Sequence, residues 1–326
     1  KATPKGNMIH DRDRNDLNKD IYKYRVQFSF GTVKWSDTIS NYQYDKKVIF
    51  PNQTASNFPI YTVNFLKSFN NMVTYKTKED FLKMEMAGKV VSNIHYEIYT
   101  SAKPGMTLKD LDNIAKEIVE KSNVTSSFLG YPQPGSIDFP AYICASPNDV
   151  IVHGIPNNYV IKEGDLLSID AGVSYEGYHA DAAFTFGIGQ ISDEDNNLIE
   201  STKYALNEAI KLVEDGQKLG TIGHKIDKIA IKKNLGNVKN YVGHGIGLEM
   251  HEAPQVPHYG KKNKGFELRT GMAICIEPMF NLGTSESTVD DDGWTVRTLD
   301  GKRSAHYEHT IGLTEEGTRV FTPNLF

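Results

Sequence analysis

Two stretches of the chain share one pattern and decide its fold: Lys162-Glu-Gly-Asp-Leu-Leu-Ser-Ile-Asp170 and Arg269-Thr-Gly-Met-Ala-Ile-Cys-Ile-Glu277. When the two are aligned, Gly164 matches Gly271, and each apolar run ends in an acidic residue. A short apolar run bounded by a glycine is typical of a buried strand. We interpret the pair as an internal duplication in which an acidic residue ends each strand.

The segments that precede these strands repeat as well. Thr77–Asp80 predicts the start of one helix by its capping pattern, and Thr107–Asp110 predicts a second. Downstream, Ser192–Asp195 predicts a third helix, and an apolar stripe after Gly216 predicts a fourth. Each half is therefore expected to consist of helix, turn, helix and antiparallel strands. Two such halves, joined around a pseudo-two-fold axis, give an α+β fold.

The first acidic strand end faces a second acid across a predicted hairpin. A turn centred between Tyr175 and Glu176 would make Asp170 and Asp181 direct cross-strand neighbours. Ionised carboxylates in that arrangement repel each other unless a cation lies between them, and Asp is depleted in strands. The alternative is that these are two exposed acids near a turn.

The second half supplies two further acids. Glu277 takes the place of Asp170, and Glu308 follows the two-residue hairpin signal Asp300-Gly301. On that last strand a period of two puts Glu308 on one face with Ser304, His306 and Thr310. Four converging carboxylates predict a site for divalent metal ions, because such ions prefer oxygen ligands and relieve the repulsion.

One histidine would complete a dinuclear site. His244 in Gly243-His-Gly-Ile-Gly247 and His153 in Val152-His-Gly-Ile-Pro156 are the candidates, because glycines let the backbone come close to a ligand. The histidines interpreted instead as ordinary surface or core residues are His10, His95, His224 and His258.

The composition excludes several classes of protein. The chain has 326 residues, with 36 Lys and Arg against 41 Asp and Glu, so its formal net charge is −5. This acidity argues against DNA binding, and no apolar run reaches the roughly 18 residues of a membrane span. The two cysteines, Cys144 and Cys275, indicate a reducing compartment. We expect a cytoplasmic protein, although a targeting leader could be missing because the chain begins at Lys1.

The first 73 residues differ from the rest. The opening 25 are polar without periodicity and are expected to be disordered or loosely held. Alternating apolar residues over Lys23–Gly31 predict one strand, and the segment from there to Asn71 is expected to lie as an arm over the body. We therefore divide the chain into an N-terminal extension, residues 1–73, and a domain of residues 74–326 that carries the carboxylates.

A series of motifs, in order, resembles one enzyme family. The motifs are Cys144-Ala-Ser-Pro-Asn-Asp-Val-Ile-Val-His153, Ile169-Asp-Ala-Gly172, Gly177-Tyr-His-Ala-Asp181, Gly243-His-Gly-Ile-Gly247, Ile276-Glu-Pro-Met279, Asp292-Gly-Trp-Thr295 and Tyr307-Glu-His-Thr310. Over about Thr74 to Pro323 the chain resembles methionine aminopeptidases of the pita-bread fold, in which a curved antiparallel sheet is flanked by helices. The 33-residue interval between His244 and Glu277 resembles type I enzymes, and a eukaryotic source is expected.

This resemblance implies a set of site residues. The ligands of two divalent ions, Co, Mn, Fe or Zn, would be Asp170, Asp181, His244, Glu277 and Glu308. The catalytic residues would be Glu277 as general base, with His153 and His251 contacting the substrate. The pocket for the methionine side chain would include Phe139, Cys144, Met250 and Trp294. A monovalent cation would bind near Asn148, Val150 and Ser304.

Two pocket residues depart from the family pattern. Phe139 stands where many members have Tyr, and Met250 stands where many have Phe. These departures affect the shape of the pocket rather than the chemistry.

The implied function is removal of the initiator methionine from nascent proteins and peptides, with preference for a small second residue. The implied partners are peptides with N-terminal Met, nascent chains and the ribosome, and a monomer is expected. One alternative is a proline-specific aminopeptidase or dipeptidase, although these usually have Arg where His306 stands. The other is a non-catalytic pita-bread binding protein, which would be expected to lack ligands.

Overall fold

The computed structural model describes residues 7–11, 23–28, 31–33 and 73–326. The chain divides into two units, residues 1–59 and 60–326. The first unit contains an antiparallel sheet of β1 (Asn7–Asp11), β2 (Lys23–Phe28) and β3 (Gly31–Val33). Strand β2 lies where a strand is predicted, whereas β1 lies where none is. The predicted arm up to Asn71 otherwise lies outside the described residues.

Within residues 73–326 the structure has four helices, and each begins near its predicted start. They are α2 (Lys78–Ser101), α3 (Leu108–Lys121), α4 (Asp193–Ile210) and α5 (Leu219–Lys233). The Thr77 and Thr107 side chains form full capping boxes, and Ser192 accepts a hydrogen bond from the backbone of Asp195. These bonds satisfy amides that have no partner within the helix, which is why the helices begin there.

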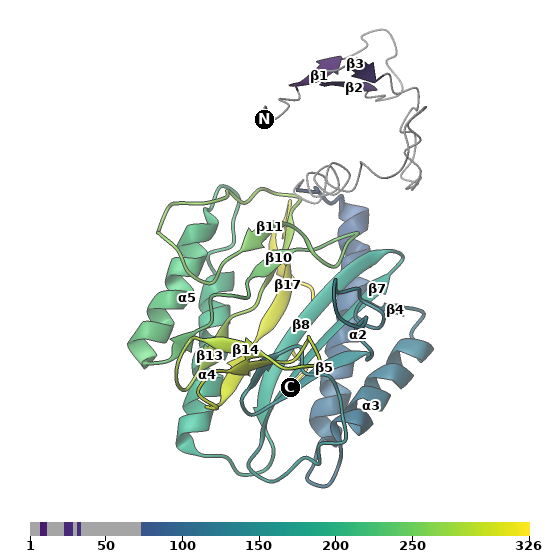
Figure 1. Ribbon diagram of the computed structural model, residues 1–326. Coiled ribbons are helices and arrows are strands. Elements are labelled where there is room, and N and C mark those ends of the chain that lie inside the picture. The colour runs from purple at the N-terminus through teal and green to yellow at the C-terminus, as the bar shows by residue number, and fades with distance from the viewer. Residues whose placement is uncertain (1–6, 12–22, 29–30, 34–72) are drawn as a thin grey trace. The chain divides into compact units, whose positions relative to one another are not determined.

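A nine-stranded antiparallel sheet forms the centre of this unit (Figure 1). Its main order is β11-β10-β12-β17-β8-β7-β4, with β5 paired to β7 and β18 paired to β17. The strands are β4 (Thr125–Ser126), β5 (Ile143–Pro147), β7 (Leu166–Tyr175), β8 (Tyr178–Gly187), β10 (Gly243–Gly245), β11 (Glu252–Val256), β12 (Ala273–Ile276), β17 (Glu308–Thr314) and β18 (Gly317–Val320). The two halves of the chain meet where β8 pairs with β17.

Two small sheets adjoin the central one. Strand β13 (Met279–Asn281) lies between β16 (Ser304–His306) and β9 (Gly236–Asn237). Strand β15 (Val296–Thr298) lies between β14 (Ser287–Val289) and β6 (Val150–Val152).

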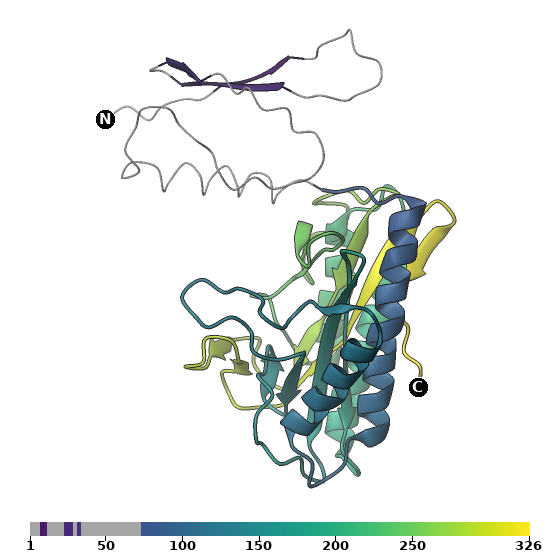
Figure 2. The same cartoon turned by 90° about the vertical axis from the view of Figure 1, so that its right-hand side faces the viewer.

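The predicted duplication is visible in matching hydrogen bonds. The amide of Gly164 donates to Ile188 O, and its counterpart Gly271 donates to Leu313 O, both at 2.8 Å. The two glycines also share a left-handed backbone, with φ of 85° and 96°. Side chains alternate between the two faces of a strand. Apolar residues on one face pack against the helices, among them Ile169, Phe184, Ile274 and Ile311. Figure 2 shows α2 running along one side of the sheet, with long loops on the other.

Two details of the predicted strands are wrong. Strand β7 continues through Asp170 to Tyr175 instead of ending at Asp170. The β7–β8 register places Asp170 opposite Ala183 and Asp181 opposite Gly172, so the two acids are diagonal rather than direct neighbours. The reason is that the turn consists of Glu176 and Gly177, which both have positive φ, 48° and 83°, as a type I′ turn requires.

The region before Glu308 also differs from its prediction. The turn at Asp300-Gly301 does not join paired strands, because β15 pairs with β14 and β6, whereas β16 pairs with β13. The single strand predicted through Glu308 is broken at Tyr307, whose amide donates to Pro278 O at 3.3 Å.

Candidate metal centre and substrate cavity

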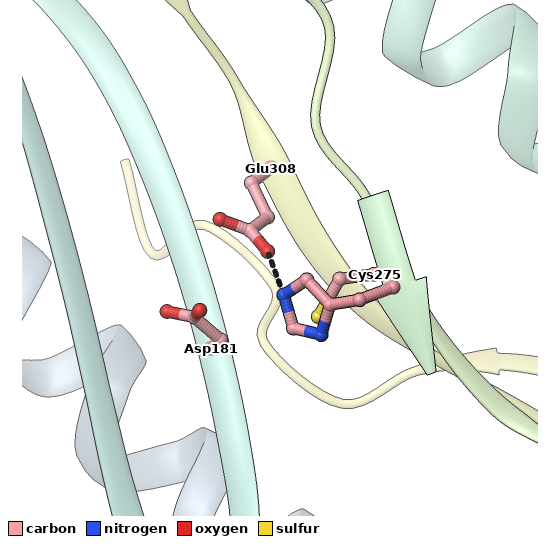
Figure 3. Close-up of side chains that lie close together, drawn as sticks. Asp181, Cys275 and Glu308 are labelled. Carbon is pink, nitrogen blue, oxygen red and sulfur yellow. Dashed lines mark ion pairs between the residues drawn. The ribbon is translucent and has the colours of Figure 1, made fainter. Parts of the chain in front are cut away.

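The four predicted carboxylates and His244 converge on the face of the sheet that is turned away from the core. Asp170 and Asp181 come from β7 and β8, Glu308 from β17, and Glu277 directly follows β12. The Nε2 atom of His244 lies 3.6 Å from Glu277 Oε1 and 3.9 Å from Glu308 Oε1. Figure 3 shows Asp181 and Glu308 projecting toward a common space from neighbouring strands. The structure therefore gathers all five predicted ligands.

Burial makes this cluster unfavourable without a cation. It raises the pKa of Asp170 to about 7 and raises the pKa of Asp181, Glu277 and Glu308 well above the usual range. For the last three, the negative charge of neighbouring carboxylates raises the pKa further. A divalent cation among them would lower these pKa values, because its positive charge offsets both the cost of burial and the repulsion between the carboxylates, and would keep the carboxylates ionised.

The donor atoms fit such an ion. Among residues 73–326, Asp170 Oδ1, Asp181 Oδ1 and Glu308 Oε1 are buried side-chain oxygens without a hydrogen-bond partner. Buried polar atoms are rarely left unsatisfied, so these oxygens indicate a group that the protein itself does not supply. Carboxylates and an imidazole together suit hard or borderline divalent metals.

His244 is oriented by its own backbone neighbour. Its Nδ1 lies 2.9 Å from Gly245 O, so Nδ1 carries the proton, and Nε2 is left with a lone pair toward the carboxylates. Burial lowers the pKa of His244 to about 3, which keeps the ring neutral as a ligand must be.

The glycines around His244 serve strand packing. A Cβ on Gly243 would collide with Cys275 O, and one on Gly245 would collide with Ala253 O. The expectation that these glycines bring the backbone close to a ligand is therefore wrong for these two positions, where the close neighbour is another strand of the protein.

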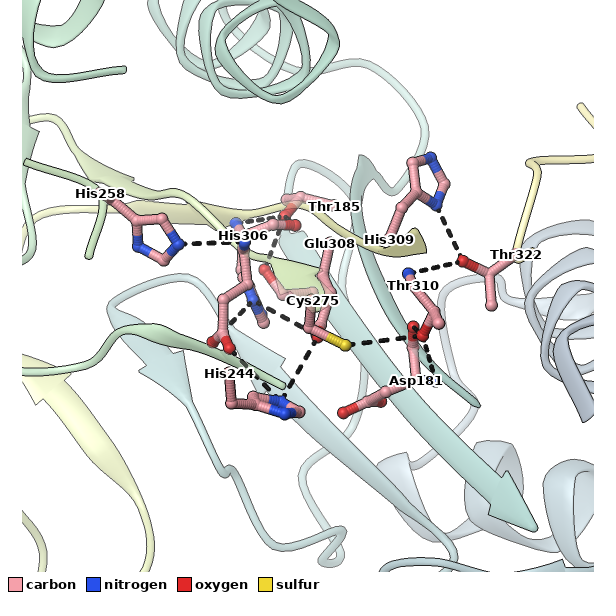
Figure 4. Close-up of polar contacts among 12 residues, drawn as sticks. Asp181, Thr185, His244, His258, Cys275, His306, Glu308, His309, Thr310 and Thr322 are labelled. Carbon is pink, nitrogen blue, oxygen red and sulfur yellow. Dashed lines mark hydrogen bonds and ion pairs between the residues drawn. The ribbon is translucent and has the colours of Figure 1, made fainter. Parts of the chain in front are cut away.

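His306 lies beside the cluster, as Figure 4 shows. Its Nε2 is 3.9 Å from Glu277 Oε2 and 4.0 Å from Glu308 Oε2. Burial lowers the pKa of His306 to about 3, so the ring is neutral. The period-two pattern of the strand predicts that His306 shares a face with Glu308, but it predicts no role for His306 at the site.

A cavity of about 320 Å³ opens onto the carboxylates. The predicted pocket and substrate residues that line it are Phe139, Cys144, His153, Met250, His251 and Trp294. Phe139 packs edge-on against Trp294, with 5.1 Å between ring centroids, and both are buried. The structure therefore brings the predicted apolar pocket and the predicted metal ligands together in one cavity.

Trp294 and His153 form one side of this cavity. The rings are edge-to-face with centroids 6.1 Å apart. His153 has a left-handed backbone, φ 58°, which is uncommon for a residue with a side chain and is often found at functional sites. Asp292 Oδ1 accepts hydrogen bonds from the amides of Trp294 and Thr295, both at 2.8 Å, and so fixes the turn that presents Trp294.

One loop that lines this cavity was not predicted from the sequence. Phe128, Tyr131, Pro132, Gln133 and Pro134 line it, and none was predicted. The Tyr131 hydroxyl lies 2.7 Å from Nδ1 of the exposed His251. The available signal was a Gly- and Pro-rich loop with aromatic residues between a predicted helix and a predicted strand.

A buried ion pair anchors the segment that carries Met250 and His251. Lys76 Nζ lies 2.7 Å from Glu252 Oε2, and the two side chains are 3% and 5% exposed. Thr74 also donates to this carboxylate, and the amide of Glu249 donates to Glu252 Oε1 at 3.2 Å. The lysine thus joins the start of the domain to a site segment 176 residues away.

His258 and His95 are core residues, as expected. His258 nevertheless touches the site, because its Nε2 accepts a hydrogen bond of 3.1 Å from the amide of Glu277. The proposed cation residues lie on two segments that meet, since the amide of Ser304 donates to Asn148 O at 2.9 Å. Val150 begins strand β6 two residues after Asn148.

The fold and the carboxylate cluster together define a hydrolase of the pita-bread fold with a site that suits divalent metal ions. The chain belongs to metallopeptidase family M24, whose model matches residues 82–315. It is 42% identical over 251 residues to methionine aminopeptidase 1 of Bacillus subtilis, which covers 77% of this chain and 99% of that protein. The predicted fold and the predicted enzyme class, methionine aminopeptidase, are both confirmed.

Solved structures give the same result. The crystal structure of methionine aminopeptidase from Thermotoga maritima matches with a TM-score of 0.75 and 38% identity, covering 78% of this chain and all of that one. The prolidase from Pyrococcus furiosus, at 20% identity and a TM-score of 0.63 over 81% of this chain and 68% of that one, shares the fold. The two methionine aminopeptidases named here are bacterial, so a eukaryotic source is not supported.

Within the described residues, no helix combines the length and apolar character needed to cross a membrane.

Proposed function

We propose that this chain removes the N-terminal methionine from peptides and nascent proteins whose second residue is small, with two divalent ions, Co, Mn, Fe or Zn, held by the five predicted ligands. The observation that carries this proposal is the single cavity in which an aromatic and sulfur-lined pocket adjoins the carboxylate cluster. Methionine is unbranched and polarisable, so it suits such a pocket.

The chemistry follows from the residues around the scissile bond. Bound divalent ions supply Lewis-acid chemistry, which polarises the peptide carbonyl and lowers the pKa of water. Glu277 accepts the proton of the attacking water and returns it to the leaving amine. His251 donates a hydrogen bond to the peptide carbonyl as negative charge develops, and Tyr131 holds its ring. His153 supports proton movement on the side of the substrate that lies away from His251.

His251→Ala tests this division of roles. We expect kcat to fall about 10²-fold, because one donor to the developing charge is lost. Metal content should stay unchanged, since His251 is not in the ligand set. Both quantities are measured on one preparation, with His224→Ala on α5 as the matched control outside the cavity. Metal loss in His251→Ala that parallels the loss of rate would contradict the separate role of His251.

A peptide series tests specificity. A change of one methylene or one branch in an apolar pocket is worth about 1–3 kcal/mol, so norleucine peptides should be cleaved appreciably and leucine peptides poorly. Met-Ala and Met-Gly ends should be cleaved faster than Met-Lys and Met-Phe, because His153, His251 and the metal ions would leave little room beside the scissile bond. The measurement is kcat/KM with Mn, Fe, Co and Zn tested separately. Preference for Leu over Met, or indifference to the second residue, would mean that the pocket is wrongly assigned.

Ala-Pro peptides in the same series test the proline-specific alternative. His306 stands where proline-specific enzymes usually have Arg, and it is buried beside Glu277 and Glu308. A neutral imidazole there gives no cation to bind a substrate carboxylate. We therefore expect Ala-Pro peptides to be cleaved far more slowly than Met-Ala-Ser.

The proposal also covers the enzyme type, the cellular location, the roles of the two parts of the chain, the partners and a monovalent-cation site. The 33-residue interval between His244 and Glu277 supports type I, and two unpaired cysteines support a cytoplasmic location. We assign catalysis to residues 74–326, treat residues 1–73 as an extension, and propose a monomer that meets its substrates as nascent chains at the ribosome. The contact between Ser304 and Asn148 supports a monovalent-cation site there with Val150.

A further inference from the structure

A cysteine thiol lies among the metal donors. Cys275 is fully buried on β12, directly opposite Thr310 on β17. Because side chains alternate along a strand, Cys275 shares its face with Glu277, and Thr310 shares its face with Glu308. The Cys275 Sγ lies 3.5 Å from Thr310 Oγ1, a weak contact. The register of the sheet therefore places this sulfur on the face of the sheet that carries Glu277 and Glu308.

The distances agree with this placement. One ligand atom each from Asp181, His244, Cys275 and Glu308 lie within 4.8 Å of one another, and all four residues are buried. Figure 3 draws Cys275 together with Asp181 and Glu308. Two oxygens of these residues, Asp181 Oδ1 and Glu308 Oε1, are among the buried side-chain atoms that have no hydrogen-bond partner within the described part of the chain. These two oxygens are therefore free to bind a metal ion, whether or not the Cys275 thiol also binds it.

We propose that Cys275 is a sulfur donor to the metal position formed by Asp181, His244 and Glu308, and that it biases this position toward thiophilic divalent ions. The inference rests on the proposed metal-dependent function and adds a ligand to it. Thiolates select softer ions, whereas carboxylates alone suit Mn²⁺. When sulfur coordinates, the S–H bond breaks, a metal–sulfur bond forms, and the proton passes to the medium.

Cobalt provides a direct test. The metal-free protein is titrated with Co²⁺, and the near-ultraviolet spectrum is followed for a sulfur-to-cobalt charge-transfer band. We expect the band in the wild type and in Cys144→Ser, which removes the other cysteine of the chain, and no band in Cys275→Ser. A serine hydroxyl can keep the contact with Thr310, so the fold should be retained, and thermal unfolding of each variant checks this.

Affinity gives a second readout. Cys275→Ser should weaken Cd²⁺ binding by at least about tenfold, measured calorimetrically, while Mn²⁺ affinity changes less than about threefold. Three results would each overturn the inference. They are the absence of a charge-transfer band in the wild type, a band that persists in Cys275→Ser, and equal losses of affinity for Cd²⁺ and Mn²⁺ in Cys275→Ser. Hydrolysis of Met-Ala-Ser without the band refutes only the sulfur ligand. A band without hydrolysis refutes the proposed function and keeps the ligand.

Discussion

Glu277→Gln should lower kcat for Met-Ala-Ser by about 10³-fold. The change keeps the shape of the side chain but removes the group that accepts and returns the proton, which contributes about 10²- to 10⁴-fold in comparable enzymes. It also replaces one of the two carboxylates near His244 Nε2, so some loss of bound metal is expected. Rate and metal content are therefore measured on the same sample.

Glu286→Gln is the matched control, because Glu286 is exposed on a loop outside the cavity. It should keep both activity and metal. If Glu277→Gln retained more than a tenth of the rate with normal metal content, Glu277 would not be the general base.

Lys76→Met should lower the free energy of unfolding by about 3 kcal/mol. Removing one partner of a buried ion pair leaves the other charge without compensation, which typically costs 3–5 kcal/mol. Here the Glu252 carboxylate would stay buried with only Thr74 and the amide of Glu249 as partners. Urea unfolding at pH 7 measures the loss.

The chain offers a matched exposed pair for comparison. Lys78 and Glu316 are 3.0 Å apart with side chains 79% and 62% exposed, so Lys78→Met should change the free energy of unfolding far less than Lys76→Met does. The double variant Lys76→Met/Glu252→Gln should recover more than half of the loss, since it leaves no unpaired charge. Equal destabilisation by Lys76→Met and Lys78→Met would contradict the importance of burial.

The helices and the strand repeat were predictable because their signals are local. Thr77 and Asp80 are three residues apart, and their hydrogen bonds form within one turn. The hairpin register was not predictable in the same way. It depends on which two residues take the left-handed conformation, and one of them is Glu176, a residue type that gives no turn signal.

The duplication predicted only half of the carboxylate arrangement. The amide of Ile188 donates to Asp165 O in the first half, and the amide of Leu313 donates to Met272 O at the equivalent place in the second. Ile188 therefore corresponds to Leu313, and five residues earlier Ala183 corresponds to Glu308. By the same register, the counterpart of Asp181 is His306. Asp170 and Glu277 are thus symmetric partners, whereas the other two acids are not. A repeat identifies equivalent backbone positions, but it does not require equivalent side chains.

Contacts between distant segments carried no sequence signal. Tyr131 and His251 are 120 residues apart, and Lys76 and Glu252 are 176 apart. Neither pair follows from periodicity, because each depends on how complete segments pack. The resemblance predicted the ligand set, and the tertiary structure was needed to find the residues that hold the surrounding loops.

The seam between β8 and β17 would couple the proposed metal binding to folding. Asp170 and Asp181 belong to the first half, and His244, Glu277 and Glu308 belong to the second, so neither half holds a complete donor set. The two ions proposed to bind these five ligands would cross-link the halves. A ligand that binds only the folded state adds about 2.7 kcal/mol of stability at a concentration 100 times its Kd. Scarcity of metal in the cell would therefore reduce the lifetime of this enzyme as well as its turnover.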